Sequence, residues 1–235
     1  MSDTNSFVNI RDLSRRDVLR QIALASTAAG AGVMSPAAAQ EVHRHTQEEV
    51  KRTGTYTPKF FKPQEYQTIT WLAELIVPAD EQSGSAVDAG APEFIDLLCS
   101  QNERLGHIYT GGLLWLDARM RQQHSVWFLE ASQAQQVALL NELVEAERDL
   151  AAKDTSFDPN FTYTQFRDYG VEPRTDLTAG VAFFDWVRKM TVDAYYTSPI
   201  GIKDLGFEGN TALNEYQVPQ DILNDAMKRS PFGSA

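Results

Sequence analysis

Residues 177–195 read LTAGVAFFDWVRKMTVDAY, and this stretch decides the fold. Its apolar side chains recur at helical spacing, with Val181, Phe184, Val187 and Thr191 in register. A long helix with such a stripe must bury it against other secondary structure. The chain contains no alternating strand pattern and no internal repeat, so the partners of this helix are predicted to be helices.

Further helices are predicted upstream of that stretch. Pro63 and Pro92 suit first helical turns, and Ser132 with Gln135 forms a capping box. The sequence predicts helices over residues 63–77, from Pro92 through Leu98, over 104–123, over 132–150 and, as a short element, over 163–169. Gly111 and Gly112 fall inside the third of these, where they predict close packing or a kink.

The two flanks of the helical region look different. Residues 40–58 are polar and are expected to be extended or mobile. Beyond Pro199 the helical period disappears, and Gly, Pro, Asn and aromatic residues predict an irregular but ordered wrap. We therefore predict an all-α fold, a single helical domain with an irregular C-terminal wrap. The expected organisation is a signal over 1–39, a polar leader over 40–62 and the helical domain over 63–235.

The first 39 residues have the layout of an export signal. Arg15 and Arg16 precede an apolar, uncharged stretch over 21–34, and small residues follow, with cleavage expected after Ala39. A bilayer needs about 20 apolar helical residues, so this stretch is too short to span one. The pattern predicts a twin-arginine signal and a periplasmic protein. The alternative is an uncleaved N-terminal membrane anchor.

Bulk composition argues against several kinds of partner and against a membrane span in the mature chain. The chain has 21 Lys and Arg and 32 Asp and Glu; without residues 1–39, which hold four basic and three acidic groups, 17 and 29 remain, a net charge of −12. Such a charge disfavours nucleic acid and anionic lipid as partners. No second long apolar run occurs, so the mature chain is predicted not to span a membrane.

Cys99 is the one cysteine of the chain, so no intrachain disulfide can form. It follows Ile95 by four residues and shares its helical face. A buried, inert thiol is predicted, with an intersubunit disulfide as the alternative.

Motifs of catalysis and cofactor binding are missing from the sequence. It has no G-x-G-x-x-G, no G-x-S-x-G and no C-x-x-C-H. His43 and His45 are interpreted as a solvated pair, and His107, four residues after Glu103, as a surface histidine. No catalytic, cofactor-binding or metal residue is therefore predicted in this chain.

Three stretches resemble one family. They are LIVPAD (75–80) with AGAPEFID (89–96), FLEASQAQQ (128–136), and YYTSPIG (195–201) with LGFEGN (205–210). Together, and in this order behind a twin-arginine signal, they resemble the gluconate 2-dehydrogenase subunit 3 family over about residues 64–216.

The resemblance implies a non-catalytic small subunit. In such complexes FAD and the chemistry belong to a large subunit of the glucose–methanol–choline oxidoreductase type, and a multihaem cytochrome c often takes the electrons onward. The small subunit is similar to an export escort for a flavin subunit that lacks a signal. A folded flavoprotein partner would explain a twin-arginine signal on a chain without a cofactor motif.

Aromatic residues near the C-terminus suggest where the partner binds. An irregular segment costs about 1–2 kcal/mol per residue to order, and interface cores are rich in aromatic residues. The predicted partner surface comprises Tyr195, Tyr196, Pro199, Phe207 and Tyr216. For Tyr195, packing on the chain's own helices is the alternative.

Two other functions stay open from the sequence. One is a stand-alone periplasmic enzyme whose site assembles from scattered residues such as Asp80, Glu93, His107 and His124. The other is a periplasmic binding or scaffold protein unrelated to flavins.

Overall fold

The computed structural model describes residues 36–153, 175–206 and 220–229. These residues are mostly helical and contain no strand, which confirms the all-α prediction. The elements are α2 (Pro36–Thr53), α3 (Pro63–Ile76), α4 (Ala91–Gln101), α5 (Glu103–His124), the 3₁₀ turn η2 (Phe128–Glu130), α6 (Gln133–Lys153), α7 (Thr178–Thr197), α8 (Pro199–Asp204) and α9 (Gln220–Arg229).

The predicted helices lie where the sequence places them. α3, α5, α6 and α7 start within one residue of their expected positions, and α4 carries Pro92 in its first turn. Gly90, directly before α4, has a φ of 80°, a conformation that glycine adopts without strain. The expected short helix at 163–169 falls outside the described residues.

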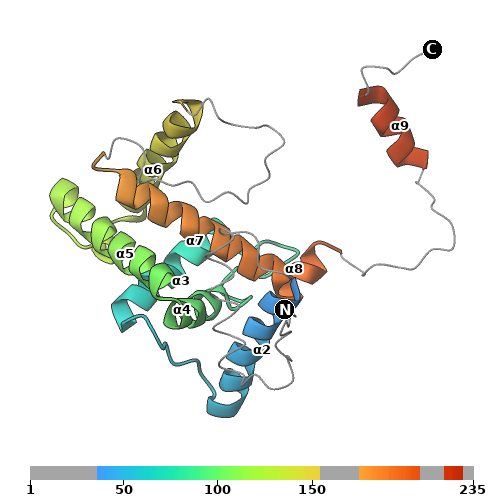
Figure 1. Ribbon diagram of the computed structural model, residues 1–235, viewed down its shortest axis with the longest axis horizontal. Coiled ribbons are helices and arrows are strands. Elements are labelled where there is room, and N and C mark those ends of the chain that lie inside the picture. The colour runs from blue at the N-terminus through green and yellow to red at the C-terminus, as the bar shows by residue number, and fades with distance from the viewer. Residues whose placement is uncertain (1–35, 154–174, 207–219, 230–235) are drawn as a thin grey trace, which may run out of the picture. The chain divides into compact units, whose positions relative to one another are not determined.

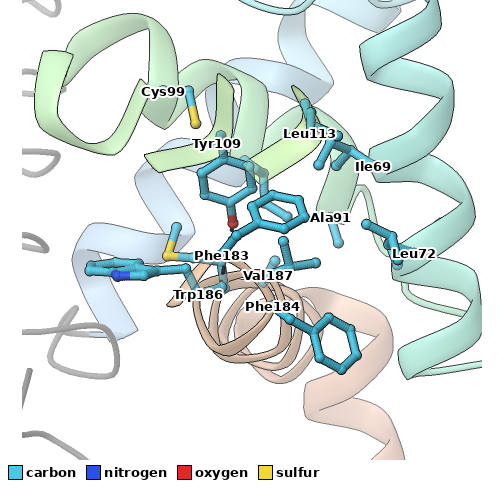
Figure 2. Packing of buried hydrophobic residues seen from close by; sticks show 14 of the residues in the cluster. Ile69, Leu72, Ala91, Cys99, Tyr109, Leu113, Phe183, Phe184, Trp186 and Val187 are labelled. Carbon is cyan, nitrogen blue, oxygen red and sulfur yellow. Dashed lines mark hydrogen bonds between the residues drawn. The ribbon is translucent and has the colours of Figure 1, made fainter. Parts of the chain in front are cut away.

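Helix α7 is the central element of the domain (Figure 1). It contacts α2, α3, α4, α5, α6 and α8, and its apolar stripe is buried as the periodicity predicts. Figure 2 shows Phe183, Phe184 and Val187 of α7 among side chains of the neighbouring helices. The ring of Phe183 meets that of Tyr109 edge to face at 5.6 Å between centroids. The core is therefore built around one helix.

Helices α5 and α7 approach closely at Gly112. A Cβ added there would lie 1.9 Å from Cγ of Phe183, closer than any real contact allows. The neighbouring Gly111 has no atom within 4 Å of such a Cβ. The close packing predicted for this glycine pair is thus confirmed for Gly112 alone.

Ion pairs attach α6 to two other helices. Arg119 of α5 contacts Glu142 at 2.7 Å, and Arg188 of α7 pairs with Glu147. All four side chains are partly buried, and Leu139, Leu140 and Leu143 supply the apolar contact of the same helix. The ion pairs and the buried leucines therefore indicate the same inward face of α6.

The expectation of an extended segment over 40–58 is wrong for most of its length. Residues up to Thr53 belong to α2, which packs on α4 and α7. Its buried residues are Ala39, Val42, His43 and Thr46, a helical spacing in which only two members are apolar. The helical domain thus includes α2 and begins upstream of residue 63.

The irregular wrap expected beyond Pro199 is also corrected. Residues 199–204 form α8, with Pro199 at its first position, and residues 220–229 form α9. Residues 207–219 lie outside the described part. The chain divides into one compact unit up to Leu205 and a second from Gly206, to which α9 belongs; α9 exposes Ile222, Leu223 and Met227.

Candidate partner-binding site

The residues predicted for the partner surface separate into three groups. Tyr195 is 2% exposed and belongs to the core, so its packing alternative is the correct one. Tyr196 is 40% exposed, and Pro199 is exposed at the start of α8. Phe207 and Tyr216 lie outside the described residues, as do Arg15 and Arg16 of the export signal.

Tyr196 and Pro199 lie at a corner made by the end of α7 and the start of α8. Ser198 organises it: its Oγ donates to the carbonyl of Tyr195 at 2.7 Å and accepts from the Gly201 amide at 3.1 Å. The serine therefore caps α8 while holding the last turn of α7. We call residues 192–205, together with the turn around Ser83, the α8 corner.

Gly201 allows the two helices of the α8 corner to meet closely. A Cβ at this position would lie 2.1 Å from the carbonyl oxygen of Tyr195, a backbone atom that cannot rotate away. The Ser-Pro-x-Gly pattern that begins at Ser198 thus has a direct structural reason. Serine caps, proline starts the helix, and glycine removes the clash.

The loop between α3 and α4 joins the α8 corner through Ser83. Its Oγ lies 2.7 Å from the hydroxyl of Tyr195. The turn is held locally by Asp80, whose Oδ1 accepts from the amides of Gln82 and Ser83 at 2.8 Å each. These two hydrogen bonds lower the pKa of Asp80. Asp80 therefore shapes the loop.

Helix α2 reaches the α8 corner through His43. Its Nε2 donates to the carbonyl of Ala194 at 2.8 Å, and its ring lies 4.9 Å from that of Phe94 between centroids. Burial lowers the pKa of His43 more than this hydrogen bond raises it. The interpretation of His43 and His45 as a solvated pair is therefore wrong for His43, which is 3% exposed.

Two shallow hollows flank α8. One, of about 270 Å³, is lined by the turn at 82–84 and by Ile200, Lys203 and Asp204. The other, of about 280 Å³, lies between α8 and α2 and is lined by Gln40, His43, Arg44, Gln47, Thr197, Pro199 and Ile202. Both are smaller than the usual 300–1,000 Å³ of small-molecule pockets.

Away from the α8 corner, Asp96 is a carboxylate with several hydrogen-bond donors. It is fully buried and accepts hydrogen bonds from Tyr56 Oη and from the amides of Lys59, Phe60 and Phe61. This carboxylate holds the segment between α2 and α3 against α4. Every one of these donors is part of the fold, so Asp96 has a structural role.

Glu93 and Tyr66 lie beside Asp96. Burial raises the pKa of Glu93, and the nearby charge of Asp96 adds to the effect. Burial also raises the pKa of Tyr66. Burial therefore disfavours the charged form of both side chains.

Two residues of the stand-alone enzyme hypothesis, His107 and His124, do not meet. They are 17 positions apart on one helix, α5, which separates them by about 25 Å. His107 is exposed, and its Nε2 lies 4.0 Å from Oε1 of an equally exposed Glu103, as expected for a surface histidine. A single site cannot use both histidines.

Within residues 36–153, 175–206 and 220–229, no group of three or more His, Cys, Asp or Glu side chains could hold a metal ion. Among the helices of that part, none combines the length and the apolar character needed to cross a membrane. Cys99 is a buried free thiol, as predicted, and burial raises its pKa.

Comparison with known proteins identifies the family. The family described as Gluconate 2-dehydrogenase subunit 3 matches residues 63–214, which include α3 through α8. No curated protein and no solved structure gives a significant match to the chain. The match covers more than half of the sequence and contains all three stretches that carry the resemblance. This chain therefore belongs to the gluconate 2-dehydrogenase subunit 3 family.

Proposed function

We propose that this chain is the non-catalytic small subunit of a periplasmic, FAD-dependent dehydrogenase acting on a sugar or polyol. The observation that carries the proposal is the family match over residues 63–214, since a third subunit implies partner subunits. FAD and the oxidation of the CH–OH group belong to a catalytic partner of the glucose–methanol–choline type. Where a multihaem cytochrome c is present, it receives the electrons from that partner.

The small subunit also acts as an export escort. Arg15 and Arg16 form the twin-arginine pattern, and this pathway moves cargo that is already folded. A flavin subunit folded around FAD needs such a route, and binding to this chain would provide it. The localisation of the complex is then the periplasm.

The α8 corner is the proposed contact with the flavin subunit. Tyr196 and Val192 lie one turn apart on α7 and are 40% and 38% exposed. Leu205, which follows α8, is 60% exposed. Exposed tyrosine and aliphatic side chains beside hollows are typical of interface cores, in which one side chain fills a pocket of the other partner.

The rigidity of this corner favours binding. Ser198, Gly201 and the Ser83–Tyr195 hydrogen bond fix the backbone on both sides of Tyr196. A surface that is fixed before binding loses less conformational entropy on association. Phe207 and Tyr216 lie outside the described residues and stay predicted partner contacts.

Co-purification tests the proposal. The tagged full chain is isolated from the periplasm of cells that express the neighbouring genes, and bound proteins are identified by mass spectrometry and by the flavin spectrum. We expect a stoichiometric flavoprotein of the glucose–methanol–choline type. Recovery of this chain alone, or of a flavin or metal spectrum from the isolated chain, would contradict the proposal and favour a stand-alone protein.

A further inference from the structure

The first turn of α2 contains the residues at which the export signal is expected to be cut. Helix α2 begins at Pro36, so Ala37, Ala38 and Ala39 are all helical. Their environments differ along the turn. Ala37 is exposed, whereas Ala39 has no exposed surface.

Ala39 is the first residue of the buried stripe of α2. Val42 and His43 follow one turn later, at 0% and 3% exposure. The imidazole of His43 donates a hydrogen bond to the carbonyl of Ala194 at 2.8 Å. This hydrogen bond attaches this part of α2 to the end of α7. Ala39 thus lies next to an anchored turn and belongs to the same packed face.

A peptidase cuts a backbone that it can bind in an extended form, and folded, packed helices resist cutting until they open locally. To present the Ala39–Gln40 bond, the chain would have to unwind the first turn of α2 and remove Ala39 from the core. In the twin-arginine pathway the domain folds before it crosses the membrane, so the peptidase would meet the folded helix.

We propose that the bond after Ala39 is not cut and that the exported subunit keeps the whole first turn of α2, with its N-terminus at or before Pro36. Ala39 is then a packing residue of the working protein. This inference rests on the proposed export. The export signal predicts cleavage after Ala39, and the inference is that this bond stays intact.

Two alanines of the same turn provide a matched test. In a signal that is cut after Ala39, both Ala37 and Ala39 are small residues read by the peptidase, so leucine at either position should block processing. In the folded helix only Ala39 is buried. The experiment purifies the wild type, Ala37→Leu and Ala39→Leu from the periplasm, sequences their N-termini and measures their melting temperatures.

We expect the wild type to begin at or before Pro36, and both variants to begin where it does. Ala39→Leu should melt about 4–8 °C lower because the extra atoms overfill the core, while Ala37→Leu should melt like the wild type. A wild-type N-terminus at Gln40, or equal melting temperatures for the two variants, would overturn the inference. Retention in the cytoplasm would instead contradict the proposed export, and the melting comparison would still test the packing of Ala39.

Discussion

The hydroxyl of Tyr195 lies 2.7 Å from Oγ of Ser83, 112 residues away in the sequence. This contact joins the loop between α3 and α4 to the end of α7, and it places Tyr195 in the core. Its neighbour Tyr196 lies edge to face with it at 5.0 Å between ring centroids but is 40% exposed. Two adjacent tyrosines thus have separable roles, one in folding and one at the surface.

Replacing Tyr196 should weaken the complex without unfolding the subunit. We expect Tyr196→Ala to reduce the affinity for the flavin subunit by about 2 kcal/mol, or about 30-fold, the size of an interface hot spot. The helical circular dichroism of the lone subunit should be unchanged. Binding is measured by titration of the purified flavin subunit.

Leu114→Ala is the control for Tyr196→Ala, because Leu114 is 63% exposed on α5, outside the α8 corner. Unchanged affinity for Tyr196→Ala would move the interface elsewhere, first to the loop over 79–91. Unfolding of the lone subunit would place Tyr196 among the folding residues. Phe207→Ala is expected to weaken binding in the same way as Tyr196→Ala.

Replacing Gly111 and Gly112 of α5 by alanine should change the free energy of unfolding in opposite directions. Gly112→Ala should lower the free energy of unfolding by about 3 kcal/mol, because the new methyl group overlaps the Phe183 ring. Gly111→Ala meets no atom within 4 Å and should raise it by up to about 1 kcal/mol through helix propensity. Urea denaturation measures both. Equal effects of the two variants would contradict the close approach of α5 and α7.

Where apolar side chains repeat clearly, the sequence was sufficient to predict the helix. Val181, Phe184 and Val187 mark the buried face of α7, and the Ser132–Gln135 capping box marks the start of α6. In both cases the local preference and the packed structure agree. The same holds for Cys99, whose burial follows from its spacing to Ile95.

Other elements were missed because polar residues are buried in them, cap a helix or hold distant backbone segments. The stripe of α2 has helical spacing, but His43 and Thr46 conceal it from a search for apolar residues. The Ser198-Pro199 pair starts the short helix α8 inside a segment that was expected to be irregular. The hydrogen bonds of Asp96 to the amides of residues 59–61 join positions more than 30 apart, which no local pattern reveals.

The stability of the folded domain should depend on pH through Asp193. Burial raises its pKa to about 6 from an ordinary 3.8, although Lys189 acts in the opposite direction. The neutral acid is thus favoured in the folded state. Its contribution to stability is fully present below pH 3.8 and is lost as the pH rises through 6.

Asp193→Asn removes this pH dependence because an amide is neutral throughout. We expect the variant to be more stable than the wild type by about 1–2 kcal/mol at pH 7.5, a value reduced for partial solvent screening, and equally stable near pH 4. Thermal melts at both pH values measure the difference. Asp204→Asn, at an exposed site on α8, is the control. A gain in stability that is the same at both pH values would contradict the raised pKa of Asp193.

Cys99 should behave as a core thiol. Cys99→Ser is expected to cost about 1–2 kcal/mol of stability, because a hydroxyl replaces a sulfur in an apolar site, and to leave assembly of the complex intact. Chemical denaturation and a non-reducing gel of the complex measure the two effects. A covalent heterodimer on that gel that disappears in Cys99→Ser would establish the intersubunit disulfide instead.

The central claim is that this chain carries a flavin subunit across the membrane. The most direct measurement is dehydrogenase activity in periplasmic and cytoplasmic fractions of cells in which Arg15 and Arg16 are both replaced by lysine. Lysine keeps the charge but not the paired guanidinium groups. The account predicts that both this chain and the flavin subunit stay in the cytoplasm, with periplasmic activity lost. Normal periplasmic activity in the double variant would contradict it.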